Sequence, residues 1–255
     1  MCMLFGVSSE RRFISNEYLR KFYQNSDKHP HGWGLACGGK YGFNIEKESV
    51  NASKSSYLNE RLKSTVDNEI VMAHIRYATI GNVEHDNCHP FFGYDSSGRQ
   101  WVLIHNGTIF EYLPLSIYSK LQTGDTDSER ILMHFIEEID KQQTEQKLKF
   151  DERFKLLDRI IYSMAKGNKL NLIFSDGKYL YVHTNCKDTL YSKSTEQGVI
   201  FSTVPLDNEK WEPVKMCTLL AYRSGKLVNK GVTHSGVFTE SPENMRLLYQ
   251  IFSGL

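Results

Sequence analysis

Cys2 stands directly behind the initiator methionine, at the start of the apolar run MLFGV. Removal of Met1, which is expected when the second residue is this small, would leave a thiol and a free α-amino group on one residue. An α-amino group titrates at about 7.7–8.0 and a thiol at about 8.5, so proton transfer between them is nearly balanced at neutral pH. Cys2 could then supply both a nucleophile and its base.

Three further stretches place residues that could bind or polarise a substrate at the ends of apolar runs. AHIRYATIG ends its run at Arg76, WVLIHNGTIF breaks at Asn106–Gly107, and TGDTDSER sets Asp125 and Asp127 before an amphipathic segment. Taken singly, each has an ordinary explanation: an edge-strand arginine in a surface ion pair, a tight Asn-Gly turn, and a helix cap. Capping by an aspartate accounts for only one of the two acidic residues.

The histidines and cysteines do not form a clear metal-binding pattern. His85 and His89 are four residues apart but lie in a loop bounded by glycine and proline, which favours packing and loop hydrogen bonds over a metal site. The five cysteines are odd in number, widely spaced and lack a CxxC pair, so we expect reduced thiols. Trp33 in HPHGWG is expected to pack in the core, and the roles of His29 and His31 stay open.

Composition favours an enzyme or binding protein without a nucleic-acid or membrane partner. The 255 residues are 40% hydrophobic, and 31 Lys and Arg residues nearly balance 30 Asp and Glu residues, which leaves no strong field for nucleic acid or anionic lipid. No apolar stretch approaches the length of a membrane span, and the N-terminus lacks a signal-peptide pattern. We therefore predict a cytoplasmic chain whose partner is a small molecule or another protein.

Hydrophobic periodicity predicts a layered α+β fold with mainly antiparallel sheets. Strands are predicted within residues 4–9, 32–47, 69–78, 99–110, 169–185, 198–206 and 217–231, with hairpin turns at SDGKY and RSGKL. Helices are predicted over 16–25, 126–142, 151–167 and 241–252, the second capped by Thr126 or Asp127. Without a repeat or linker, residues 2–255 are expected to form a single domain.

The order of these stretches resembles the glutamine-hydrolysing domain of class II glutamine amidotransferases. IRYATIG is similar to the family's arginine motif, NCHPF to its His-Pro segment, IHNGTI to its oxyanion motif and DTDSE to its acidic motif. The resemblance runs from Cys2 to about LIFSDGKYLYV, more weakly through GVIFSTVPLDNEKWEPV, and is greatest to stand-alone YafJ-type members. It implies the four-layer αββα fold of the N-terminal nucleophile hydrolases. One departure is His31, where related sequences often carry an acidic residue before Gly-Trp-Gly.

The resemblance implies a role for each matched residue. Cys2 would attack the glutamine side-chain amide while its α-amino group shuttles the proton, and ammonia would leave behind a γ-glutamyl thioester that water hydrolyses. The Asn106 side chain and the Gly107 N–H would stabilise the oxyanion. The remaining residues would bind the substrate: Arg76 its α-carboxylate and Asp127 its α-ammonium group, with backbone groups of Thr79 and Ile80 lining the same pocket.

Neither a metal nor a cofactor is implied, but the substrate and partner stay open. The chain would either hydrolyse glutamine outright or pass ammonia to a separate synthase or acceptor subunit, since no synthase domain is expected within it. One alternative is a γ-glutamyl hydrolase that acts on a peptide or thiol conjugate. An alternative of another class is a ligand-binding or regulatory subunit without catalysis.

Overall fold

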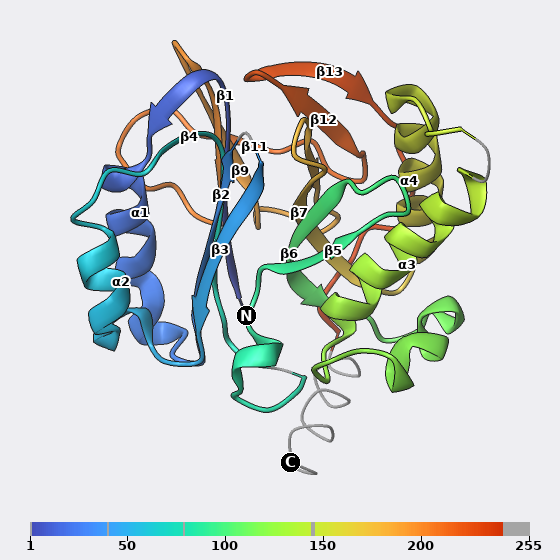
Figure 1. Ribbon diagram of the computed structural model, residues 1–255, viewed down its shortest axis with the longest axis horizontal. Helices are drawn as coiled ribbons and strands as arrows, with labels where there is room; N and C mark the ends of the chain where they lie inside the picture. The colour runs from blue at the N-terminus through green and yellow to red at the C-terminus, as the bar shows by residue number, and fades with distance from the viewer. Residues whose placement is uncertain (1, 40, 79, 144–145, 242–255) are drawn as a thin grey trace.

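The computed structural model describes residues 2–39, 41–78, 80–143 and 146–241. Two antiparallel sheets face each other, and α-helices cover the outer face of each, so that the layers run helix, sheet, sheet, helix (Figure 1). The predicted α+β fold with four αββα layers is therefore confirmed. The helix expected over 241–252 falls on residues 242–252, which lie outside the described ranges.

The two sheets differ in strand number and in their helical cover. The seven-stranded sheet has the order β11 (Glu212–Pro213), β9 (Tyr191–Thr195), β10 (Gly198–Ser202), β1 (Met3–Ile14), β4 (Asp67–Ile75), β2 (Trp33–Gly39), β3 (Gly42–Glu48). The six-stranded sheet has the order β13 (Lys226–Lys230), β12 (Leu220–Arg223), β8 (Leu180–His183), β7 (Lys169–Ser175), β6 (Gln100–Thr108), β5 (Phe91–Tyr94). The first is covered by α1 (Asn16–Tyr23) and α2 (Ser56–Arg61), the second by α3 (Asp127–Gln142) and α4 (Phe150–Met164) (Figure 1).

Short 3-10 helices occupy several connections between these elements. They are η1 (Gln24–Lys28), η2 (Ala52–Lys54), η3 (His85–Asn87) and η4 (Leu113–Lys120). η3 lies in the loop between β4 and β5, and η4 lies between β6 and α3. These two connections follow the ends of β4 and β6.

Alternation along the strands distributes apolar side chains among three core layers. In β1, Met3, Phe5 and Val7 belong to the core under α1 and α2, whereas Leu4 belongs to the core between the sheets. In β6, Trp101 and Leu103 pack under α3 and α4, whereas Val102 and Ile104 face the other sheet. Each strand therefore has one inward face, and residues two apart share it.

The long helices form where apolar residues recur every three or four positions. In α3, Ile131, Leu132, Phe135 and Ile139 are buried on one face, and the Thr126 side chain caps the helix by accepting from the Glu129 N–H at 3.3 Å. The helices predicted over 16–25, 126–142 and 151–167 are confirmed as α1, α3 and α4. The six-residue α2 was not predicted, because so short a helix shows little periodicity.

Glycine-containing turns were predicted correctly at two places, and a third candidate turn lies within a strand. SDGKY joins β7 to β8 and RSGKL joins β12 to β13, with Gly177 and Gly225 at positive φ. The Asn106–Gly107 pair, for which a tight turn was the ordinary explanation, instead continues β6 as far as Thr108. Pairing with β7 through this point overrides the local turn preference of the dipeptide.

Candidate active site

Cys2 immediately precedes β1, at the end of the sheets where the chain begins (Figure 1). Its thiol is partly exposed and contacts the backbone of Tyr77: Sγ accepts from the Tyr77 N–H at 3.3 Å and lies 3.4 Å from the Tyr77 carbonyl oxygen. Burial raises the pKa of the thiol, and the negative charge of Asp127 raises it further. The hydrogen bond from the Tyr77 N–H and the positive charge of Arg76 lower it, but by less. The thiol is therefore protonated at neutral pH and requires a base to become a nucleophile.

Arg76 follows β4, a central strand, and its side chain is only 2% exposed. The guanidinium donates to three successive carbonyl groups, to Ile80 at 3.1 Å, Gly81 at 3.0 Å and Asn82 at 2.8 Å. No carboxylate pairs with it within the described ranges, so the surface ion pair offered as its ordinary explanation is wrong. These three bonds wrap residues 80–82 around the guanidinium group. The Ile80 carbonyl, one of the backbone groups expected to line the pocket, is thus bonded to Arg76, and Thr79 lies outside the described residues.

Asn106 and Gly107 lie where β6 extends beyond its pairing with β5, which ends at Leu103. Asn106 shares the inward face with Val102 and Ile104, by the alternation of the strand. It is 2% exposed, and within the described part of the chain its side chain has no hydrogen-bond partner. Its amide therefore has donors available to a ligand between the sheets.

The direction of the Gly107 N–H follows from its partner on β7, Leu170. The Leu170 N–H donates to Asn185 Oδ1 at 2.8 Å, and its carbonyl oxygen lies 2.9 Å from His183 Nδ1. Because both Leu170 groups point away from β6, Gly107 and Leu170 form a non-hydrogen-bonded pair, and the Gly107 N–H also points away from β7. This donor is aimed at the edge of β6 that β5 does not cover.

Asp127 is the first residue of α3 and is 5% exposed. Its Oδ2 accepts from the Ile109 N–H at 2.7 Å, and its Oδ1 lies 3.4 Å from Ser128 Oγ. No cationic side chain pairs with it in the described ranges, and it lines an open pocket of about 400 Å³. The neighbouring Asp125 is exposed and bonds to the side chain of Asn87 instead, so the structure separates the two aspartates.

Two charged residues that are far apart in the sequence act on the Cys2 thiol. Arg76 lowers and Asp127 raises the pKa of the thiol, so a cation and an anion from different segments both act on it. The strands β1, β4 and β6 are in contact with one another, and their inward faces look into the same layer. Asn106, which shares the inward face of β6, therefore lies in the layer between the sheets that these strands line.

His31 joins this site although its role was left open at the level of sequence. Its Nδ1 accepts from the Ala78 N–H at 2.9 Å, its backbone N–H donates to the Arg76 carbonyl at 3.1 Å, and its ring packs on Tyr77. Burial and then the charge of Arg76 lower the His31 pKa, so the ring is neutral and keeps its acceptor at pH 7. The histidine thus provides an acceptor for the backbone that follows Arg76.

Among the described residues, none of the remaining motif residues hydrogen-bonds to the thiol. Trp33 is fully buried in the core, with its indole N–H 3.0 Å from Glu48 Oε2. His89 is buried with its ring 4.0 Å from that of His74, whereas His85 is exposed. Among the residues that the structure describes, no group of three or more His, Cys, Asp or Glu side chains could hold a metal ion.

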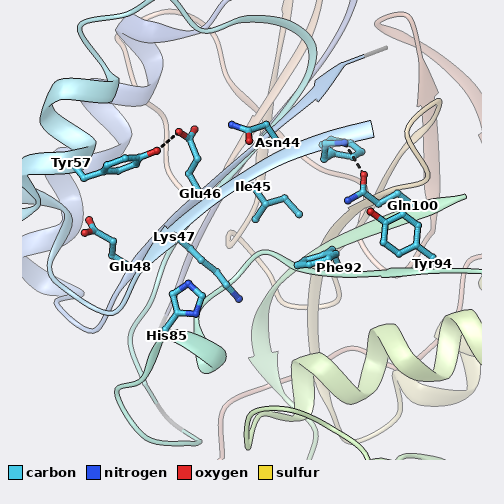
Figure 2. A pocket seen from close by; sticks show the side chains of 11 residues that line it. Asn44, Ile45, Glu46, Lys47, Glu48, Tyr57, His85, Phe92, Tyr94 and Gln100 are labelled. Carbon is cyan, nitrogen blue, oxygen red and sulfur yellow. Dashed lines mark hydrogen bonds between the residues drawn. The ribbon is translucent and has the colours of Figure 1, made fainter. Parts of the chain in front are cut away.

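An open pocket of about 760 Å³ lies along the edge strands β3 and β5 and contains none of the residues discussed as catalytic (Figure 2). Figure 2 shows Lys47 of β3 close to His85 of η3. The Lys47 ammonium group donates to the Cys88 carbonyl at 2.8 Å, in the loop that precedes β5. No helix in the described ranges combines the length and hydropathy needed to cross a bilayer.

Comparisons with known proteins bear on the family and the fold of the chain. The family model described as class II glutamine amidotransferases matches residues 1–195. An uncharacterised protein of Methanocaldococcus jannaschii is 28% identical over 283 residues, which cover 97% of this chain and 78% of that protein. The Escherichia coli protein YafJ, whose name assigns it to the glutamine amidotransferases, is 26% identical over 72% of this chain and 74% of its own.

A solved structure provides the same comparison at the level of the fold. It is that of a Pseudomonas aeruginosa protein described as a predicted glutamine amidotransferase, and it matches with a TM-score of 0.62 at 19% identity. The match covers 89% of this chain and 95% of that one, so the two share a fold. Since the family model spans most of its length, the chain belongs to the class II glutamine amidotransferases, a family of glutamine-hydrolysing enzymes.

Proposed function

We propose that the chain hydrolyses the side-chain amide of glutamine, with Cys2 as the nucleophile. The observation that carries this proposal is that two buried, opposite charges, Arg76 and Asp127, both act on the pKa of the thiol. Arg76 and Asp127 are both buried, and neither has an ionic partner among the described residues. An α-amino acid is a zwitterion, so its carboxylate would bind Arg76 and its ammonium group Asp127 while the side chain extends to Cys2.

The chemistry follows from the groups around the thiol. Sγ of Cys2 loses its proton to the α-amino group and bonds to the amide carbon, whose oxygen becomes an oxyanion. The Asn106 side chain and the Gly107 N–H would donate to that oxygen, a contribution of about 3 to 4 kcal/mol for each donor. The carbon–nitrogen bond then breaks as the nitrogen takes the proton and leaves as ammonia. Water attacks the thioester by the same route, which releases glutamate and restores the thiol.

The raised pKa of Cys2 makes the base essential. A free α-amino group of Cys2 would supply it, whereas an amide nitrogen in a chain that retains Met1 has no basic lone pair. Enzyme with Met1 or an N-terminal tag attached should therefore be nearly inactive. Intact mass and activity of N-terminally and C-terminally tagged preparations would test this, and full activity with Met1 retained would refute the role of the amine.

Where the ammonia goes is a separate question, and the proposal allows release to water or transfer to a separate synthase subunit. A γ-glutamyl peptide or thiol conjugate would present the same zwitterionic end and differ only at the leaving group. Ammonia release from glutamine, compared with amine release from γ-glutamyl conjugates, would distinguish these substrates. A regulatory protein without catalysis would bind them and release nothing.

The direct experiment compares two cysteines that are both partly exposed, Cys2 and Cys186. Cys2→Ala should abolish glutamate formation without altering the melting temperature, whereas Cys186→Ala should retain both. A diazoketone analogue of glutamine should label the N-terminal peptide alone, because only that thiol lies between the substrate-binding charges. Unchanged turnover in Cys2→Ala would rule out the mechanism.

A further inference from the structure

The mechanism above uses Asp127 but not the two polar side chains that connect it to β6. His105 on β6 is 1% exposed, and Ser128 on α3 is 4% exposed. His105 Nδ1 lies 2.9 Å from Ser128 Oγ, which in turn lies 3.4 Å from Asp127 Oδ1. A buried chain of hydrogen-bonding groups therefore runs from the residue before Asn106 to the carboxylate at the start of α3.

The second ring nitrogen of His105 determines which group donates in each of these hydrogen bonds. Nε2 lies 3.1 Å from the Lys169 carbonyl oxygen, which can only accept a hydrogen bond. Nε2 therefore carries the proton, and in a neutral ring Nδ1 is an acceptor. Burial lowers the pKa of His105, and the Asp127 charge and the hydrogen bond to the Lys169 carbonyl oppose this effect only in part. The lowered pKa keeps the ring neutral. The Ser128 hydroxyl hydrogen must then point at His105.

Ser128 has one hydroxyl hydrogen and two acceptors within reach. The 2.9 Å separation from His105 Nδ1 is a good hydrogen-bond distance, whereas 3.4 Å to Asp127 Oδ1 is at the limit. Asp127 Oδ2 is already engaged by the Ile109 N–H at 2.7 Å. Oδ1 is thus the carboxylate oxygen that stays open, and it does so because the nearest hydroxyl donates elsewhere.

We propose that His105 and Ser128 form a positioning pair that holds the serine hydroxyl away from Asp127 Oδ1 and so keeps this oxygen available to the α-ammonium group of the substrate. The inference rests on the role proposed above for Asp127. Without an acceptor at residue 105, the hydroxyl would rotate to Oδ1 and compete with the ammonium group. A ligand that lacks the ammonium group would not experience this competition.

The test measures binding in the Cys2→Ala chain, which turns nothing over, with glutamine and its des-amino analogue as ligands. His105→Leu removes the acceptor, and we expect it to weaken glutamine about tenfold while the analogue binds as before. His105→Asn, which can place an amide oxygen near the Nδ1 position, should show no such selectivity. Adding Ser128→Ala to His105→Leu removes the competing hydroxyl and should restore most of the lost affinity.

Several results would overturn the inference. Equal weakening of both ligands in His105→Leu, or no recovery in the double variant, would mean that His105 only supports the fold. Nitrogen NMR of the histidine-labelled wild type needs no variant: a proton found on Nδ1 instead of Nε2 would refute the pair directly. If Cys2→Ala itself bound no glutamine, the proposed function would fail and this inference with it, whereas normal binding with the wrong tautomer would refute the inference alone.

Discussion

Gly107→Ala is a demanding test of the active-site geometry, because β6 has no room for a methyl group there. An ideal Cβ at residue 107 would lie 1.8 Å from the Lys169 carbonyl oxygen and 2.4 Å from His105 Nε2. The carbonyl belongs to the paired strand β7 and cannot swing aside as a flexible side chain would. Reaching an ordinary contact distance of 3.4 Å requires a movement of about 1.6 Å between the strands.

That movement has a cost in stability and a larger cost in rate. Overpacking of this kind destabilises a protein by roughly 1–3 kcal/mol, which lowers the melting temperature of a chain this long by several degrees. A displacement of about 1 Å at a reacting group can cost about 100-fold in rate, and loss of one oxyanion donor about 100- to 1,000-fold. We therefore expect kcat to fall at least 100-fold while KM, which would depend on Arg76 and Asp127 in the proposed binding mode, changes little.

The assay is ammonia release at a temperature well below the melting transition of the variant, so that the folded fraction exceeds nine-tenths in any case. Gly39→Ala is the matched control: this residue also lies in a strand, β2, but its added Cβ would meet only the Gly42 carbonyl at 3.5 Å. The control should retain wild-type stability and kcat. A folded Gly107→Ala enzyme with near-normal kcat would refute the assignment of its N–H to the oxyanion.

Four other predictions address the remaining site residues. Asn106→Ala should lower kcat about 100- to 1,000-fold with little effect on KM, since its donor acts on the developing charge; a rise in KM alone would contradict this. Arg76→Lys should raise KM, because lysine cannot make the two parallel hydrogen bonds of a guanidinium to a carboxylate. Asp127→Asn should weaken the binding of glutamine but not of its des-amino analogue. The two ligands and the two proteins form a double-mutant cycle, and additive losses would mean that Asp127 does not contact the substrate amine. The pKa of His31 is lower in the folded chain than in the unfolded chain, so the unfolded chain binds the proton more readily. The contribution of the neutral His31 ring to stability is therefore complete above about pH 6.5 and declines as the pH falls towards the folded pKa. Melting curves of wild type and His31→Asn should therefore diverge below about pH 6.5, with the wild type losing more, and parallel curves would refute the neutral-acceptor role.

The local hydrophobic pattern predicted correctly the elements that bury one face against a sheet. The apolar spacing of α3 and α4 predicts both helices because each buries one stripe against a sheet. It was a poor guide at Asn106–Gly107 and Arg76, where the ordinary explanations were a turn and a surface ion pair. Both explanations assume a local environment, and both fail because long-range strand pairing buries these residues at the end of a sheet.

The sequence by itself determined the inventory of the site: a cysteine behind Met1, and an arginine, an Asn-Gly pair and an aspartate in the order that resembles class II glutamine amidotransferases. Only the tertiary structure decided that Arg76 and Asp127 act on one thiol and that the Gly107 N–H is turned away from β7. The physical reason is that orientation within a sheet has a period of two residues, so a register shift of one would reverse every inward face. That register is set by pairing between segments far apart in the chain, and local conformational preferences do not predict this pairing.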